Sequence, residues 1–169
     1  MGLRRDGREA AVQYLFAHEL HEPSGKKSTE EIHAFWELHL AKPAVRQFAD
    51  ELTTGVLQHI EDIDARISEA CTNFHISRIA NVDRNILRLA IYELVHKPDL
   101  DAPVIINEAI EIAKKYGSPE SRSFVNGIVD RVAKQVRNQM RSPRKPKPAA
   151  LEDLAPEELT PAAATGNGA

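Results

Sequence analysis

Three arginines gather at the start of the chain: Arg4, Arg5 and Arg8. An arginine guanidinium can bind two phosphate oxygens at once, so such a cluster suits contact with a nucleic-acid backbone. Arginines at a chain end are nevertheless more often ordinary solvated charge. From Arg8 to His21 the apolar residues recur at helical spacing, so we expect a basic arm over residues 1–7 that leads into a helix.

A second candidate site lies in the stretch 119–136, where valines and isoleucines at helical spacing form one apolar face. Phe124 lies at the edge of that face, and Gly127 is its neighbour on the helical wheel. A glycine inside a helix costs about 1 kcal/mol relative to alanine, so Gly127 indicates that something packs close to the backbone. Tight contact with another helix is the ordinary explanation. The alternative is a ledge where the Phe124 ring and polar neighbours such as Asn126 meet a ligand.

The stretch 103–116 predicts the helix that precedes this one, with an apolar arc opposite an arc of Asn, Glu and Lys. Gly117 suits a left-handed helix end, Ser118 suits an N-cap, and Pro119 suits a first helical turn. The two stretches together therefore predict a pair of helices joined by a short turn.

The elements that must position these residues are also helical. A capping-box pattern of Ser28 and Glu31 predicts a helix to about Leu40, and Pro43 begins the longest apolar stripe, which runs for seven turns to Ala70. Residues 82–96 predict a central helix, because apolar side chains cover most of its circumference. The expected fold is all-α, with about six helices arranged as two three-helix bundles packed across each other.

One carboxylate lies inside the apolar arc of the central helix. A buried Glu93 must be paired or hydrogen-bonded, or it would take up a proton. Because no nucleophile or second carboxylate accompanies it at a recognisable spacing, a structural ion pair fits better than catalysis. Arg8, which lies on the apolar side of its own predicted helix, is the partner that we propose.

Composition limits the classes of protein that the chain can belong to. Its 169 residues suffice for one domain with a real core, and the net charge of −3 argues against indiscriminate nucleic-acid binding. The single cysteine, Cys71, excludes an internal disulfide. No apolar run approaches the roughly 20 residues of a membrane span, so we expect a cytoplasmic protein. Residues 1–141 form the predicted domain, and residues 142–169, rich in Pro, Ala and charge, a disordered tail.

Two residue pairs have the Glu-x-x-His spacing of di-iron helical bundles: Glu30 with His33 and Glu93 with His96. Such sites need two further inward glutamates, and pairs of this kind arise readily by chance. The sequence has no glycine-rich phosphate loop, CxxC pair or GxSxG motif. We therefore expect no enzyme activity, no metal and no cofactor.

Three motifs resemble those of the NusB family of bacterial transcription antitermination factors. They are RRxxRExAxQxLF (residues 4–16), VDRNILRLAIYEL (82–94), and INEAIEIAKKYG (106–117) followed by FVNGIVD (124–130). The motifs occur in the family's order and spacing, over roughly residues 3–140. The resemblance implies the family's two-bundle helical fold.

The resemblance also implies a function: binding of boxA-type single-stranded RNA together with the small-subunit ribosomal protein NusE. The factor would act in the RNA polymerase antitermination complex that transcribes ribosomal RNA operons. Arg4, Arg5 and Arg8 would then hold phosphates. The residues that contact bases would be Arg122, Phe124 and Asn126.

Asp83 and Arg84, expected on the exposed side at the start of the central helix, match the position that contacts NusE in the family. An acid in a first turn also suits the helix dipole, so a purely structural role remains open for Asp83. Asp6 and Gly7 depart from the family pattern of a further basic residue and an alanine, which predicts a looser helix start and weaker RNA affinity. Two alternatives are a helical domain of the kind attached to RNA cytosine methyltransferases and a scaffold that binds no RNA.

Overall fold

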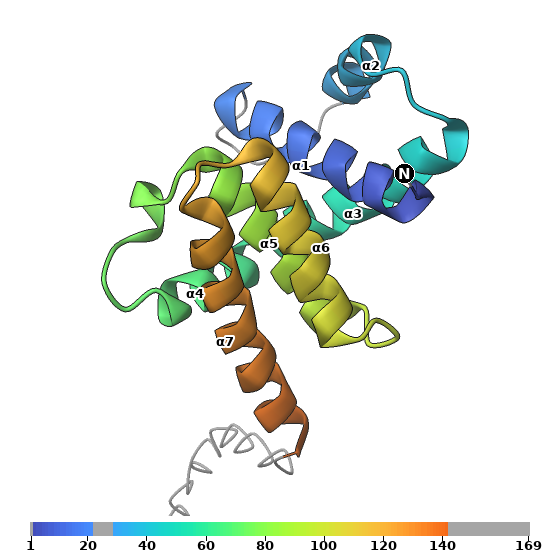
Figure 1. Ribbon diagram of the computed structural model, residues 1–169. Helices are drawn as coiled ribbons and strands as arrows, with labels where there is room; N and C mark the ends of the chain where they lie inside the picture. The colour runs from blue at the N-terminus through green and yellow to red at the C-terminus, as the bar shows by residue number, and fades with distance from the viewer. Residues whose placement is uncertain (1, 22–28, 142–169) are drawn as a thin grey trace, which may run out of the picture.

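The structure is a computed structural model that describes residues 2–21 and 29–141, and its regular structure within those ranges is entirely helical (Figure 1). The elements are α1 (Leu3–His21), α2 (Thr29–Leu38), α3 (Pro43–Gln58), α4 (Ile60–Ala70), the short 3-10 helix η1 (Ile76–Arg78), α5 (Asn81–His96), α6 (Ala102–Tyr116) and α7 (Ser121–Arg141). The all-α class is confirmed, with seven α-helices in the described ranges where about six were expected. The predicted tail and Ser28 of the capping box lie outside the described residues.

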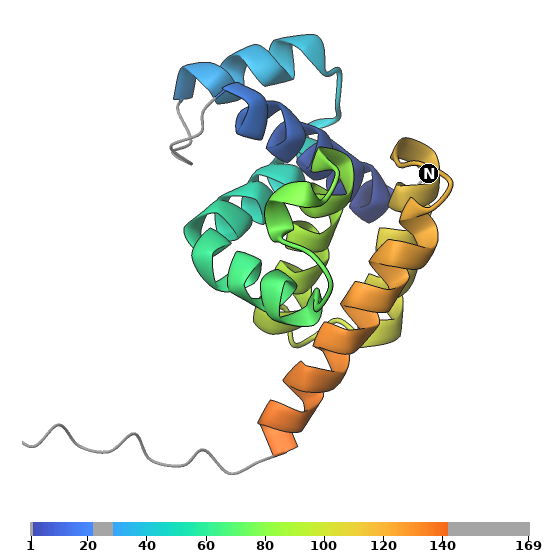
Figure 2. The same cartoon turned by 90° about the vertical axis from the view of Figure 1, so that its left-hand side faces the viewer.

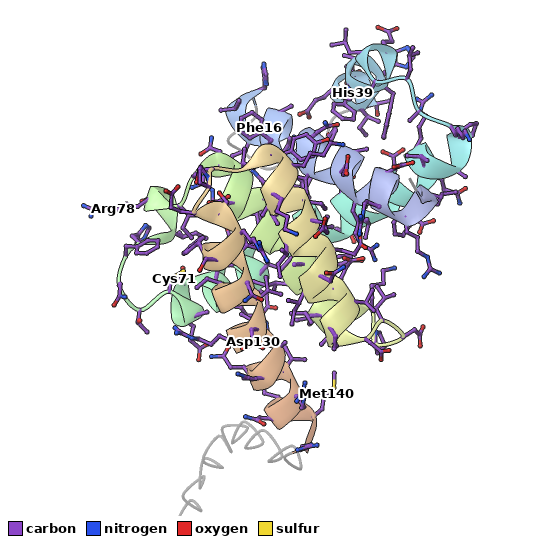
Figure 3. The ribbon with its side chains drawn as sticks, viewed as in Figure 1. Phe16, His39, Cys71, Arg78, Asp130 and Met140 are labelled. Carbon is purple, nitrogen blue, oxygen red and sulfur yellow. The ribbon has the colours of Figure 1, made fainter. Side chains whose placement is uncertain are left out.

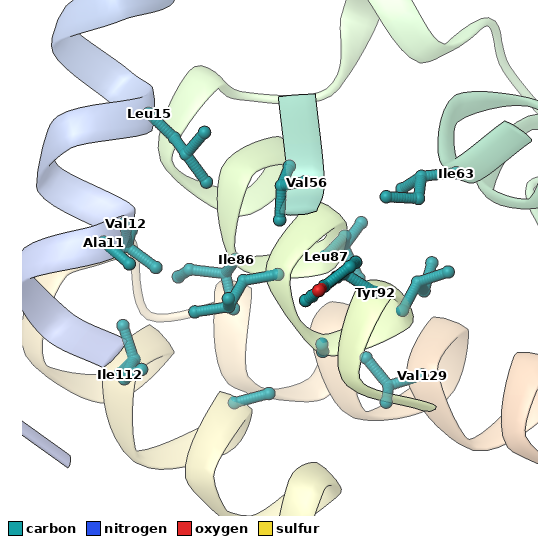
Figure 4. Packing of buried hydrophobic residues seen from close by; sticks show 14 of the residues in the cluster. Ala11, Val12, Leu15, Val56, Ile63, Ile86, Leu87, Tyr92, Ile112 and Val129 are labelled. Atoms are coloured by element: carbon teal, nitrogen blue, oxygen red, sulfur yellow. The ribbon is translucent and has the colours of Figure 1, made fainter. Parts of the chain in front are cut away.

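Helix α5 is central, as its apolar circumference predicts. It packs against α1 and α3 on one side and against α6 and α7 on the other, while α4 packs against α5 and α7. Ile86 and Leu87 of α5 are almost completely buried in the core that these helices share (Figure 4). Two groups of helices thus meet across α5. None of the described helices has the length and apolar content that crossing a membrane would require.

The predicted seven-turn helix from Pro43 to Ala70 is interrupted at His59. The His59 N–H is shared between the carbonyl oxygens of Gly55 and Val56, at 3.3 and 3.2 Å, and its backbone leaves the helical conformation. The His59 ring stacks on that of His96 with 4.0 Å between ring centroids. The apolar stripe continues across this break, which is why periodicity alone does not reveal it. The break directs α4 onto α5 and α7.

The basic arm is part of α1, which begins at Leu3, so the expected loose start is absent. Gly7 is buried, and a Cβ at this position would lie 2.4 Å from a ring carbon of Phe48. Glycine therefore lets α1 approach α3 closely enough for the Phe48 ring to fit between them. The departure from alanine at position 7 serves packing.

The turn between α6 and α7 differs from its prediction in detail. Gly117 has an extended backbone, with φ −88° and ψ −176°, and is not left-handed. A Cβ on Gly117 would lie 2.5 Å from Ser121 Cβ, so glycine is needed here for close approach. Helix α7 begins at Ser121, whose Oγ accepts a hydrogen bond of 2.9 Å from the Ser118 N–H. The two serines thus close the turn together.

Candidate nucleic-acid interface

Arg8 forms a buried ion pair with Glu93, as predicted. Its Nε donates to both carboxylate oxygens, at 3.0 and 2.9 Å, and its Nη2 donates to Oε1 at 2.8 Å. Arg8 is 3% exposed and Glu93 is 2% exposed. The guanidinium is thereby used to satisfy a buried carboxylate between α1 and α5. A phosphate contact by Arg8 would require this pair to break, so we remove Arg8 from the expected RNA surface.

Arg5 is half-buried and is held by a carboxylate of α6. Its Nε and Nη2 bind the two oxygens of Glu108 at 3.0 and 2.8 Å. The hydrogen bond from Arg5 is the main cause that lowers the pKa of the Glu108 carboxyl below its usual value. Arg4 is exposed, and with Arg5 it lines a hollow of about 340 Å³ that also includes Val104 of α6. Of the three predicted phosphate contacts, Arg4 is the most accessible.

The start of α7 lies across α6 from the N-terminal arginines. The hydrogen bond from Lys114 is the main cause that lowers the pKa of the Glu111 carboxyl. The charges of Arg5 and Arg122 lower this pKa further. Glu111 therefore lies near both the N-terminal arginines and the first turn of α7. In Figure 2 the N-terminus and the start of α7 lie on the same side of the molecule, and Figure 1 shows α6 between them. We call Arg4, Arg5 and Arg122 the arginine edge.

Phe124 lies on the other flank of α7, facing the segment between α4 and α5. Its ring stacks on that of Phe74 with 5.7 Å between centroids and 28° between planes. The two rings line a pocket of about 240 Å³ that Cys71, Gly127 and Arg131 also border. In Figure 3 the labelled Cys71 and Arg78 mark this segment. We call these lining residues, from α4, the following segment and α7, the ring pocket.

The structure therefore divides the three base-contact residues expected on α7. Residues four apart share a flank of a helix, whereas residues two apart lie about 200° around it. Arg122 and Asn126, both exposed, form one row on the α6 side, and half-buried Phe124 lies on the α4 side. A single base cannot contact Phe124 and Asn126 together across the helix.

Gly127 lies on the solvent-facing crest of α7, between these two flanks. It is exposed, and a Cβ on it would meet no atom within 4 Å. The explanation by tight packing against another helix is therefore wrong, and the alternative of an open ledge agrees with the structure. Gly127, which has no side chain, therefore lies between the Arg122–Asn126 row and the ring pocket.

Asp83 and Arg84 are not on the exposed side of α5, because they are 7% and 9% exposed. Arg84 donates to the carbonyl oxygens of Ile76 and Ile79, at 3.2 and 3.1 Å, and pairs with Glu19 of α1. It thus fastens η1 and α1 to the start of α5. Within the described chain, the Asp83 Oδ1 atom has no hydrogen-bond partner.

Sequence reasoning missed Phe74 and Arg131. Phe74 is 39% exposed, which is unusual for a large ring, and it lies in the irregular segment after α4. An exposed aromatic residue in a short connection between helices is a signal that periodicity does not use. Arg131 borders the pocket and donates to the carbonyl oxygen of Ala70, which ties α7 to the end of α4.

Comparison with known proteins identifies the family. The NusB family model matches residues 5–134. The chain is 43% identical over 136 residues to the transcription antitermination protein NusB of Sorangium cellulosum, covering 80% of this chain and 95% of the relative. It is 44% identical over 133 residues to that of Geobacter sulfurreducens, covering 79% and 95%. The chain belongs to the NusB family.

Solved structures of the NusB family share the fold. T. maritima NusB has a TM-score of 0.68 at 36% identity, covering 78% of this chain and 91% of that one. A crystal structure of the antitermination factors NusB and NusE in complex with double-stranded RNA has a TM-score of 0.69 at 26% identity, covering 80% and 98%. The arginine edge and the ring pocket thus lie on a NusB fold. In the described part of the chain, no group of three or more His, Cys, Asp or Glu side chains is placed to hold a metal ion.

Proposed function

We propose that this chain is a transcription antitermination factor that binds boxA-type single-stranded RNA together with a NusE-type ribosomal protein. It would act in the cytoplasm within the RNA polymerase antitermination complex on ribosomal RNA operons. Membership of the NusB family supports this, as does the likeness to a NusB–NusE–RNA complex. The observation that carries the proposal is the ring pocket beside the open backbone of Gly127, with exposed Arg122 and Asn126 on the opposite flank of α7.

A strand on this surface would be held in two different ways. Arg4 and Arg5 would contact phosphates at the N-terminal end of α1, and Arg122 would continue the cationic surface onto α7. Asn126 presents an exposed amide, which can pair with the edge of an unstacked base. Because Gly127 has no side chain, the strand can cross α7 there and place another base beside the Phe124 ring. Stacking of a base on an aromatic ring contributes about 1–3 kcal/mol.

The protein partner would bind near the start of α5. Arg84 is committed to the carbonyl oxygens of η1, so we propose that it shapes this surface by holding η1 in place. The Asp83 Oδ1 atom is buried and has no hydrogen bond in the described chain, but the residue is 7% exposed, and a NusE-type protein could contact that accessible part. Asp83→Asn should weaken binding of the NusE-type protein and leave RNA affinity in its absence unchanged. Equal affinity of Asp83→Asn and the unmodified protein for the partner would exclude this contact.

An electrophoretic shift assay with a boxA oligonucleotide, with and without the NusE-type protein, tests the function. We expect binding that strengthens when the partner is added and weakens as salt rises, because phosphate contacts release counterions. A scaffold that binds no RNA would give no shift under either condition. We also propose that the chain is an adaptor without enzyme activity. Calorimetric titration with a methyl donor tests the methyltransferase alternative, and we expect no binding.

A further inference from the structure

The ring pocket holds a more exposed ring than Phe124. Phe74 is 39% exposed, whereas Phe124 is half-buried. The two rings are stacked 5.7 Å apart, so Phe124 supports Phe74 from the α7 side. An incoming planar group would therefore find more accessible ring surface on Phe74.

The charges and polar groups around these rings favour a nucleobase as the occupant. The described residues that line the pocket include one cation, Arg131, and no carboxylate. The charge of Arg131 also reaches Cys71 in the pocket wall: burial raises the pKa of that thiol, and Arg131 partly opposes the rise. A cation beside exposed rings is the combination that binds single-stranded nucleic acid through stacking and phosphate contact. Asn73 and Thr72, both exposed, add hydrogen-bonding groups at the rim.

The dimensions of the pocket agree with one base. Its volume of about 240 Å³ is below the roughly 300–1,000 Å³ of sites for drug-sized molecules, so it suits a single ring system. Its open side adjoins the exposed backbone of Gly127, where a Cβ would meet nothing within 4 Å. A strand that crosses α7 at Gly127 therefore arrives at the mouth of this pocket.

We propose that the ring pocket binds one unpaired RNA base, with Phe74 as the stacking ring, Phe124 as its support and Arg131 as the neighbouring cation. This inference rests on the proposed function, because it assumes that the bound strand is RNA. It assigns the principal stacking contact to Phe74, a residue from the segment between α4 and α5. Phe124 then positions the Phe74 ring by stacking on it, and it also lines the pocket.

The test is a set of variants titrated with a single-stranded boxA oligonucleotide. Phe74→Leu keeps an apolar side chain but removes the ring, and we expect an increase in Kd of about five-fold or more. Phe74→Tyr keeps the ring and should bind with nearly the affinity of the unmodified protein. Leu38→Ala is the matched control, because Leu38 is 84% exposed on α2 and does not border the ring pocket. Thermal unfolding of each variant checks that the fold is retained.

A second arm identifies the base. The oligonucleotide is resynthesised with one abasic site at each position in turn, and each form is titrated against the unmodified protein and Phe74→Leu. One abasic position should weaken binding to the unmodified protein about five-fold or more and have little further effect on Phe74→Leu. Additive losses at every position would overturn the assignment of a base to Phe74.

The remaining outcomes separate this inference from the function on which it rests. If the unmodified protein binds the oligonucleotide and Phe74→Leu binds equally well, the pocket inference fails and the proposed function stands. If the unmodified protein binds no RNA with or without the NusE-type protein, both fail. If Phe74→Leu loses affinity only for the NusE-type protein, measured without RNA, the pocket is a protein interface and the inference is overturned.

Discussion

The two flanks of α7 differ in how their charges are balanced. On the α6 side Arg5 is held by Glu108, Lys114 by Glu111, and α1 contributes Glu9 as the partner of Lys115. On the α4 side the ring pocket has a cation and no carboxylate in its described lining. A phosphate at the arginine edge must compete with carboxylates already present, whereas a base that stacks on a ring displaces only water. Clustered arginines in a sequence therefore do not by themselves measure how much positive charge a surface offers.

The largest effect should come from Arg8, which is buried between α1 and α5 and lies on neither flank of α7. Arg8→Met leaves Glu93 buried without its partner, and removing one member of a buried pair costs about 3–5 kcal/mol. Urea unfolding should show this loss. The double variant Arg8→Met/Glu93→Leu should regain most of the stability, because no buried charge remains, and should bind RNA like the unmodified protein. A single variant of unchanged stability would show that the pair does not hold α1 to α5.

Phe124→Ala should have the next largest effect, now on RNA affinity. Removing the ring that supports the stack should cost about 1–3 kcal/mol of binding free energy. The ratio of the Kd of Phe124→Ala to that of the unmodified protein should be nearly the same at low and high salt. Titrations at two salt concentrations measure it, with thermal unfolding as the check on the fold. An unchanged Kd would remove Phe124 from the site. A loss that disappears at high salt would assign the effect to charge and contradict the contrast between the flanks.

Helical periodicity was sufficient to predict the class of fold and the central position of α5. The pairing of Arg8 with Glu93 was also predictable, because a buried carboxylate requires a partner and Arg8 lay on an apolar face. The same observation conflicts with a phosphate role for Arg8. Pattern and family resemblance thus pointed to different roles for one residue, and only the geometry decides between them.

Other features of the fold and of the site could not be predicted from the spacing of apolar residues. The break at His59 leaves the apolar stripe intact. Arg84 looks like an exposed first-turn charge, although it donates to carbonyl oxygens of the preceding segment and pairs with Glu19. Phe74 lies in an irregular segment, where no periodicity assigns a face. The separation of Asn126 from Phe124, however, follows directly from 3.6 residues per turn. That part of the site was predictable from the helical wheel alone.

Gly127→Ala should change stability and RNA affinity in opposite directions. Open space around position 127 means that alanine meets no clash, and its higher helix propensity should stabilise the fold by up to about 1 kcal/mol. If a strand crosses the helix there, the added methyl group should weaken RNA binding. Asn138→Ala, at an exposed position further along α7 that does not border the ring pocket, is the control for small changes on this helix. A more stable variant with unchanged affinity would place the strand elsewhere.

Glu108→Gln tests the compensation at the arginine edge. Removing this carboxylate frees Arg5 for a phosphate, so RNA affinity at low salt should increase and the slope of log K against log salt should steepen by about 0.7. Arg4→Gln should make the slope shallower by a similar amount, because Arg4 is already exposed. Equal slopes for Glu108→Gln and the unmodified protein would mean that the Arg5–Glu108 pair does not limit phosphate binding.

The smallest effect is the pH dependence of this same ion pair. The Arg5 guanidinium lowers the pKa of the Glu108 carboxyl in the folded protein, relative to about 4.3 in the unfolded chain. A group with a depressed folded-state pKa stabilises the fold above its unfolded pKa, and this stabilisation is lost as pH falls through its folded pKa. The Arg5 side chain is 30% exposed, so solvent screening limits the contribution to at most about 1 kcal/mol. In urea unfolding from pH 6 to pH 3, the difference between the unmodified protein and Glu108→Gln should therefore shrink as the pH falls below about 4.3. A constant difference over that interval would mean that Glu108 does not hold Arg5 through its charge, and the arginine edge would then be as uncompensated as the ring pocket.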